Sequence, residues 1–158
     1  MNNPEVSNPR IAVLSLALSA AAFVGLISME GYSDTAIIPV PGDVPTVGFG
    51  STNGVTMTTR ITPVEAVQRA LQDSNKFQST LKQCVKVPLH QYEYDAFVSL
   101  AYNIGPTAFC NSTLVKRLNS KDYSGACQEI LKWDKFKGKP LAGLTARRQR
   151  EYKECIGD

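Results

Sequence analysis

Residues 41–52 read PGDVPTVGFGST, a stretch in which glycines and prolines alternate with the apolar residues Val44, Val47 and Phe49. The same mixture of glycine, proline and β-branched residues extends over residues 31–60. Short apolar runs bounded by glycine and proline are typical of short strands joined by tight turns. The sequence therefore predicts a small antiparallel sheet within residues 31–60.

After residue 61 the spacing of apolar residues becomes helical. Thr62-Pro63-Val64-Glu65 is a capping box with proline at the first helical position, and it predicts a long helix that ends near residue 86. The apolar face expected for this helix comprises Val64, Val67, Leu71, Phe77 and Leu81.

More helices are expected in the second half of the chain. A central core helix is predicted over residues 91–104, where Gly105 would end it, with Phe97, Leu100, Ala101 and Ile104 on one side. Shorter helices are predicted over residues 112–119, 122–133 and 146–155. The order of helix, small sheet, long helix and helical lobe is that of an α+β fold.

Residues 11–28, IAVLSLALSAAAFVGLIS, contain no charged residue. As a helix these 18 residues would span about 27 Å, close to the thickness of a bilayer core. Nine of them are Ala, Ser or Gly, so membrane insertion would be only weakly favourable, and the helix could enter the membrane and later leave it. Two alternatives remain, a signal peptide cleaved near residues 19–22 and a core helix that never meets a membrane.

The four cysteines, Cys84, Cys110, Cys127 and Cys155, form no CxxC pair, and the chain has a single histidine. This composition argues against a zinc site and favours two disulfides in an oxidising compartment. Three pairings are possible, and we favour Cys84–Cys110 with Cys127–Cys155. Buried free thiols are the alternative.

Charge is distributed unevenly along the chain, whose net charge is +3. Residues 79–158 carry 13 Lys and Arg against 8 Asp and Glu, which favours an anionic partner such as cell wall, nucleic acid or a membrane surface. A solvated basic surface without such a partner is the alternative. The aromatic residues follow helix-core spacing and are not interleaved with the basic ones, which argues against nucleic acid.

Glu30 is the first acidic residue after the apolar segment. Enzymes that hydrolyse glycosides need an acid that protonates the leaving oxygen and a second group that directs water or stabilises positive charge. A carboxyl group at a helix end, beside apolar residues in a cleft, would keep its proton more readily than one in water. Glu30 is therefore a candidate general acid, and a solvated acid beside a membrane is the alternative.

Met29-Glu30-Gly31, followed by residues 41–52 with Thr46, resembles the T-even type of phage lysozyme, glycoside hydrolase family 24. The resemblance covers essentially residues 29–155. It continues in residues 91–105, Phe109, residues 111–114, Gly143-Leu144, Arg147-Arg148 and Glu151. The individual matches are short, and their order and spacing carry the signal.

The resemblance implies a lysozyme-like fold, in which a small antiparallel sheet lobe and a mainly helical lobe are joined by a long helix. It implies an endolysin that hydrolyses the β-1,4 bond between N-acetylmuramic acid and N-acetylglucosamine in peptidoglycan, with inversion, for host cell lysis. Glu30 would be the general acid, and Thr46 would help to position water. Asn103 would lie near the cleft, and Arg147 would bind substrate or form a salt bridge. We expect a monomer without metal or cofactor.

One feature departs from the family pattern. The family places an Asp nine residues after the Glu and six before the Thr, where this sequence has Pro39 and Val40. Thr46 is also one residue farther from Glu30 than in the family. Asp43 is our candidate for the second, water-orienting carboxylate, and Asp34 is the second choice.

Residues 11–28 resemble the signal-anchor-release (SAR) segments of phage endolysins. The resemblance implies two domains, an N-terminal SAR helix at residues 1–29 and a lysozyme-like muramidase domain at residues 30–158. The host export machinery would place the uncleaved helix in the inner membrane, and its release into the periplasm would activate the enzyme. Because the segment has no cysteine, we expect control by topology and refolding alone.

Two other functions compete with hydrolysis. A wall-binding module without catalysis would use the basic half of the chain to hold an anionic polymer. A lytic transglycosylase would use one acid and cyclise the muramic acid instead of adding water.

Overall fold

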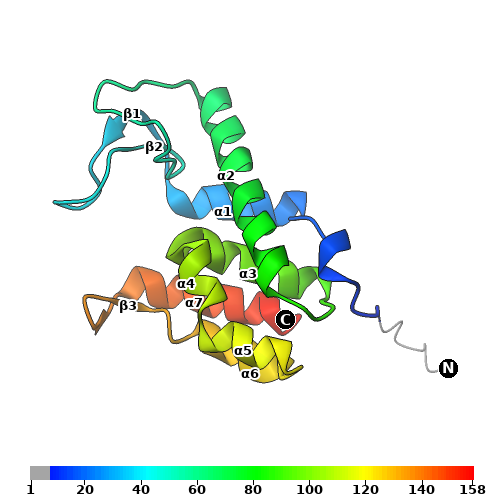
Figure 1. Cartoon of the computed structure of the whole chain (residues 1–158). Helices are drawn as coiled ribbons and strands as arrows, with labels where there is room; N and C mark the ends of the chain where they lie inside the picture. Colours follow the sequence, from blue (N-terminus) through cyan, green and yellow to red (C-terminus); the bar gives the residue numbers. More distant parts are fainter. Residues whose placement is uncertain (1–7) are drawn as a thin grey trace.

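The computed structural model describes residues 8–158, which form two lobes joined by a long helix. In Figure 1 the helix α2 (Pro63–Cys84) runs from the sheet of β1 (Ser33–Ile37) and β2 (Thr46–Gly48) down to a helical lobe. The helix α1 (Ala20–Glu30) lies between the two lobes and leads directly into β1. The predicted α+β arrangement is confirmed.

The sheet lobe is a single irregular hairpin. The two strands are antiparallel, with Ser33 opposite Gly48 and Ile37 opposite Thr46, so five residues of β1 face three of β2. Residues 38–45 form the long loop of this hairpin. A second hairpin, β3 (Lys135–Phe136) with β4 (Lys139–Pro140), was not predicted. Its two turn residues, Lys137 and Gly138, both have positive φ, as a tight two-residue turn requires.

The predicted capping box begins α2. The Thr62 hydroxyl accepts from the Glu65 backbone N–H at 3.3 Å, and the Glu65 carboxylate accepts from the Thr62 N–H at 2.7 Å. The predicted apolar face, however, was wrong in its first half, because Val64, Val67 and Leu71 are exposed. The buried side of α2 instead consists of Ala66, Ala70, Ser74, Gln78 and Leu81.

Close approach of the sheet explains this difference. A Cβ atom on Gly48 would lie 3.0 Å from the Cβ of Ala66, so β2 packs directly against the helix. Only a small side chain fits on α2 at such a contact. The buried side of α2 therefore carries alanines here. A prediction that places the large apolar residues inside chooses the opposite side of the helix.

The helical lobe surrounds α3 (Gln91–Ile104), whose middle is completely buried. Around it pack α4 (Pro106–Cys110), α5 (Thr113–Asn119), α6 (Tyr123–Ile130) and α7 (Ala142–Cys155). The expected core residues Phe97, Leu100 and Ala101 have no exposed surface. Helix α7 begins four residues earlier than predicted, because Thr145 donates to the Leu141 carbonyl within the first turn and does not cap the helix.

Both predicted disulfides are present. Cys84–Cys110 joins the end of α2 to α4, and Cys127–Cys155 joins α6 to the end of α7. All four cysteines are paired, so the alternative of buried free thiols is wrong.

The apolar segment 11–28 is not one helix in this structure. It contains a short 3₁₀ turn, η1 (Val13–Ser15), then an extended stretch, and α1 begins only at Ala20, where the Ser19 hydroxyl accepts from the Ala22 N–H. Val13 and Leu16 are buried in the core of the helical lobe. Among residues 8–158 no helix is both long enough and apolar enough to cross a membrane.

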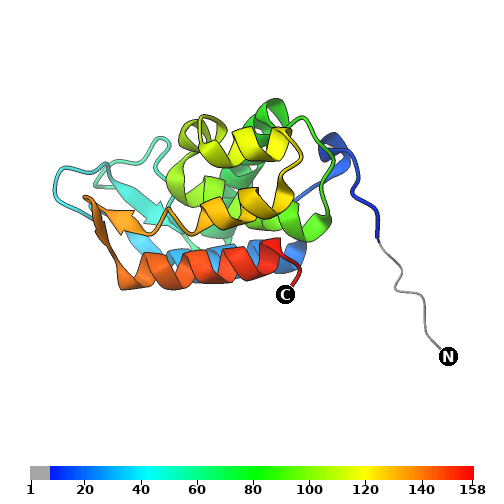
Figure 2. The ribbon, with the colours of Figure 1, turned by 90° about the horizontal axis from the view of Figure 1, so that it is seen from below.

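In Figure 2, seen from below, α7 lies in front of α1, and a cavity of about 300 Å³ lies between α1, α3 and α7. The small residues Ala21, Ala22 and Gly25 of α1 line one side of it, and Glu154 lines the other. Asp95, Glu151 and Arg150 also line the cavity. Burial, and then the negative charges of Asp95 and Glu151, raise the pKa of Glu154 to about 7.

Glu154→Gln should reduce the dependence of stability on pH. Because the folded protein holds the Glu154 proton more tightly than the unfolded chain, this stabilisation is present below about pH 4.5 and is lost as pH rises through about 7. The variant should have a higher Tm than wild type above pH 7 and a flatter Tm profile below it, measured by circular dichroism. Asp158→Asn, at the exposed C-terminus, is the control. Parallel profiles for wild type and Glu154→Gln would contradict the prediction.

Candidate active site

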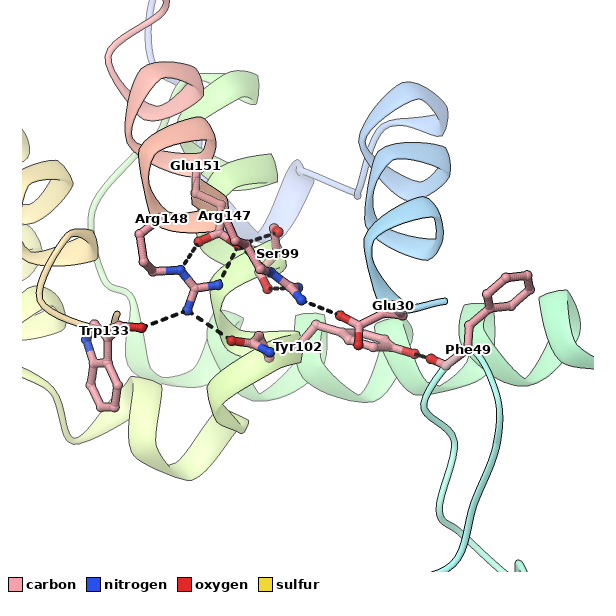
Figure 3. Close-up of polar contacts among 9 residues, drawn as sticks. Glu30, Phe49, Ser99, Tyr102, Trp133, Arg147, Arg148 and Glu151 are labelled. Carbon is pink, nitrogen blue, oxygen red and sulfur yellow. Dashed lines mark hydrogen bonds and ion pairs between the residues drawn. The ribbon is translucent and has the colours of Figure 1, made fainter. Parts of the chain in front are cut away.

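Glu30 is the last residue of α1, and Gly31, with φ of +72°, ends the helix directly after it. Its carboxylate is mostly buried, with 16% of the side chain exposed. Oε1 accepts a charge-assisted bond from Nη1 of Arg147 at 2.6 Å (Figure 3). Oε2 faces Gly50, where a Cβ would lie 3.5 Å away. The carboxylate is therefore held on one oxygen and has open space beside the other.

Arg147 belongs to a buried network between α3 and α7. Its Nε donates to Oε1 of Glu151 at 3.1 Å, and its Nη2 donates to the Ser99 carbonyl at 3.3 Å. The Ser99 hydroxyl donates to the same Glu151 oxygen at 2.7 Å. Nε of Arg148 lies 2.7 Å from the other oxygen of Glu151, Oε2. Removing one partner from such a network leaves a buried charge uncompensated, so the network fixes the direction of Arg147.

Arg148 links the network to the predicted residue Asn103. Its Nη1 donates to Oδ1 of Asn103 at 3.0 Å and to the Trp133 carbonyl at 3.4 Å. Asn103 itself is exposed near the end of α3. Both arginines are buried, and each forms a salt bridge with Glu151.

Tyr102 connects the helical lobe to the hairpin. Its hydroxyl donates to the Phe49 carbonyl at 3.1 Å (Figure 3). Its ring packs edge-on against Phe77, with centroids 4.9 Å apart. Burial, followed by the charges of Asp73 and Glu30, raises the pKa of Tyr102, so the hydroxyl keeps the proton that it donates. The turn after β2 is thereby held against α3, close to Glu30.

A cavity of about 340 Å³ lies where the end of α1 meets the hairpin. It is lined by Glu30, Gly31, Tyr32, Ser33, Ile37, Pro39, Thr46, Val47, Gly48 and Gly50. Glu30 and Thr46, predicted from separate parts of the sequence, thus border the same space. The Thr46 hydroxyl donates to the Val44 carbonyl at 3.2 Å.

Neither candidate for the second carboxylate lines this cavity. Asp43 is exposed in the hairpin loop, where its Oδ1 accepts from the Val44 N–H at 2.8 Å. Asp34 is exposed on β1. Its neighbour Ser33 lines the cavity, and because successive strand residues point to opposite faces, Asp34 points away from it. The role of either residue stays a prediction.

Sequence reasoning missed the roles of Tyr102 and Ser99. Both lie in the stretch 91–105, and their spacing of three places them on the same side of a helix as Asn103. That spacing could have marked a polar face of α3. The partners on that face, Phe49 and Glu151, are distant in sequence and appear only in the fold.

The chain matches the family model described as phage lysozyme over residues 27–151. The chain belongs to the phage lysozyme family. It is similar to the SAR-endolysin of Pseudomonas phage phiKMV, with 35% identity over 89% of each chain. It is also 46% identical to an endolysin of Acyrthosiphon pisum secondary endosymbiont phage 1, over 67% of this chain and 75% of that protein.

Two solved structures share the fold. The endolysin from Escherichia coli O157:H7 phage FAHEc1 superposes with a TM-score of 0.78 and 33% identity, covering 90% of this chain and 94% of that one. The muramidase domain of SpmX from Asticaccaulis excentricus superposes with a TM-score of 0.82 and 28% identity, covering 89% and 98%. The fold is therefore lysozyme-like, as the sequence predicted.

Family membership makes this protein a glycoside hydrolase of the lysozyme type that lyses peptidoglycan. The expected enzyme class is confirmed, and a wall-binding module without catalysis is not favoured. The cavity lined by Glu30 and Thr46 is the candidate site for this activity.

Tyr102→Phe should weaken the enzyme without disturbing its core. The variant keeps the ring against Phe77 and leaves the Phe49 carbonyl without its donor, which costs about 1 kcal/mol. We expect a Tm a few degrees lower, since about 1 kcal/mol shifts the Tm of a domain this size by roughly 2–4 °C, together with a lower kcat. Tyr92→Phe, an exposed tyrosine on the same helix, is the control. Equal kcat and Tm in the two variants would show that Tyr102 does not hold the hairpin.

Proposed function

We propose that this enzyme hydrolyses the β-1,4 bond between N-acetylmuramic acid and N-acetylglucosamine with inversion, using Glu30 as general acid. The observation that supports this most is that Glu30 and Thr46 border one cavity. Inversion requires an acid on one side of the glycosidic bond and a water molecule on the other. A carboxyl group from α1 and a hydroxyl group from β2, both lining one cavity, suit these two tasks.

In this proposal the two oxygens of Glu30 have different tasks. Oε1 stays with Arg147, which fixes the side chain, while Oε2 beside Gly50 carries the proton to the leaving oxygen. The positive φ of Gly50, +89°, and its lack of a side chain keep this oxygen accessible. Because the Glu30 side chain is mostly buried, competition from bulk water is limited.

The second carboxylate is proposed to be Asp43. Its place in the long loop between β1 and β2 allows it to approach the cavity if the loop closes over a bound glycan, whereas Asp34 is fixed on the other face of β1. Thr46, at the start of β2, would hold the attacking water together with Asp43. Substrate contacts remain part of the proposal, with Asn103 near the cleft and Arg147 binding acidic peptide stems.

Three carboxylate variants test this assignment. Glu30→Gln should lower kcat by about 10²–10⁴ because no proton reaches the leaving group, while binding to peptidoglycan is retained. Asp43→Asn should lower kcat by about ten-fold or more, and Asp34→Asn should leave it unchanged. Turbidity assays measure the rates, and mass spectrometry of muropeptides identifies reducing ends.

The outcomes separate the alternatives. If the Glu30→Gln variant is active, Glu30 is not the general acid. If Asp34→Asn lowers kcat more than Asp43→Asn does, Asp34 and not Asp43 is the second carboxylate. Anhydro-muramic products in place of reducing ends would identify a transglycosylase.

We also propose that residues 11–28 first anchor the protein in the host inner membrane as a helix and later release it to the periplasm, where it lyses the cell. The host export machinery would insert the segment without cleavage. The weakly apolar composition of the segment supports this, and relatives named SAR-endolysins support it as well. In this proposal residues 1–29 act as the anchor and residues 30–158 as the muramidase domain.

Release would also control activity. A membrane helix over residues 11–28 ends two residues before Glu30, so the carboxylate would be held at the bilayer, apart from Arg147 and Thr46. In the structure the first part of the same segment, residues 11–19, is unwound against the helical lobe. One segment would thus have two arrangements, and only the second builds the site.

Gly25→Leu combined with Ala20→Leu should trap the protein in the membrane. Each leucine favours insertion by about 0.3–0.6 kcal/mol. Both positions are exposed in the structure, and a Cβ at Gly25 meets nothing within 4 Å, so the released fold tolerates them. Fractionation and lysis timing in cells provide the measurement, with serine at both positions as the control. Undiminished lysis by the leucine variant would refute release.

A further inference from the structure

The backbone just before α1 is bonded by side chains of the helical lobe. The Leu18 N–H donates to Oε1 of Gln78 at 2.7 Å, and the Ser19 N–H donates to Oδ1 of Asp95 at 3.0 Å. The Ala17 carbonyl accepts from Nε2 of Gln91 at 2.8 Å. Three consecutive residues of the segment are therefore held through their main-chain groups.

These side chains are themselves fixed in place. Gln78 and Asp95 are 7% and 4% exposed. The Tyr94 hydroxyl donates to the same oxygen of Gln78 at 3.1 Å, and Gln91 donates to Asp95 at 2.9 Å. A buried amide or carboxylate that loses a donor is left poorly satisfied, so Gln78 and Asp95 favour the arrangement in which the segment is docked.

A second contact holds the segment farther upstream. Arg10 donates to both carboxylate oxygens of Glu93, with the shortest distance 2.7 Å, and its guanidinium lies 3.6 Å from the centre of the Tyr123 ring. Ile11 and Leu89 exchange two backbone hydrogen bonds of 2.9 Å. The chain is thus bound to the helical lobe on both sides of η1, at residues 10–11 before the turn and at residues 17–19 after it.

Packing along α1 itself is weak. Leu26 is its only buried residue, and Ala21, Ala22 and Gly25 border the cavity of about 300 Å³. The helix is therefore located mainly by its two ends. Because each helical residue adds about 1.5 Å and 100°, a slip of one residue at Ser19 would take Glu30 out of reach of Arg147.

We infer that Gln78, Gln91 and Asp95 are positioning residues for the hydrolysis, which act on Glu30 through α1. They fix where the helix begins, and Arg147 receives the carboxylate at the other end, about 16 Å away. This inference rests on the proposed function, since it requires Glu30 to be the acid. It also assigns a role to residues 17–19, which are not helical and whose main-chain groups these side chains bind.

The test uses two single variants of the full chain, Gln78→Leu and Asp95→Leu. Each keeps the approximate side-chain volume and removes the oxygen that accepts from the main chain of the segment. We expect kcat on soluble peptidoglycan chains to fall about ten-fold or more, because a small misplacement of a catalytic group is costly, with KM within two-fold of wild type. Hydrogen exchange should rise over residues 20–30 and not over α3, α5 or α6. Asp95→Asn, which keeps the accepting oxygen, should restore most of kcat.

Two further variants keep the test decisive. Gln72→Leu, exposed on the same helix as Gln78, is the matched control and should behave as wild type. If Gln78→Leu does not fold, Gln91→Ala, at an exposed position, should still lower kcat and loosen residues 20–30.

The results distinguish the two proposals. Folded leucine variants with wild-type kcat and wild-type exchange over α1 would overturn the inference, as would a loss of activity accompanied by exchange throughout the lobe. If Glu30→Gln is inactive while Asp95→Leu is fully active, only the inference fails. If Glu30→Gln is active, the proposed function fails.

Discussion

The ion pair between Glu30 and Arg147 joins the two parts of the molecule on which the site depends. Glu30 comes from the end of a loosely packed helix, and Arg147 comes from a buried network of Ser99, Arg148 and Glu151. The network is rigid because its charges are buried and mutually paired. Because α1 is not rigidly packed, the position of the Glu30 carboxylate is fixed by its bond of 2.6 Å to Arg147, which the network holds in place. Tyr102 holds the hairpin in place through its bond to the Phe49 carbonyl, so that Gly50 lies beside the Glu30 carboxylate.

If Glu30 is the general acid, as proposed, catalysis depends on how the N-terminal segment is placed. The same apolar residues that suit a membrane helix supply Val13 and Leu16 to the core once the segment is docked. Polar side chains of the lobe bind the main chain of residues 17–19, which are not helical. In the proposed release, one sequence serves both as a weakly inserted anchor and as a docked segment, and only the docked state brings Glu30 to Arg147.

Local signals predicted much of the fold. The capping box at Thr62, the glycine after Ile104 and the glycine-rich hairpin are encoded within a few residues, and each was found where it was expected. Prediction failed where distant elements decide the outcome. The buried side of α2 is set by the close approach of Gly48, and the start of α1 is set by Ser19 and Asp95. Glu30 and Thr46 could be named from a motif, but Tyr102 could not, because its partner lies 53 residues away in sequence.

A double-mutant cycle on Glu30 and Arg147 tests most directly whether their bond joins helix and network. Wild type, Glu30→Gln, Arg147→Met and the double variant would be unfolded in urea at neutral pH. If the bond couples the two parts, the free energies of unfolding should be non-additive by about 0.5–3 kcal/mol, with the double variant less destabilised than the sum of the single ones. Additivity within about 0.3 kcal/mol would contradict the account, since the carboxylate would then be placed without help from the arginine.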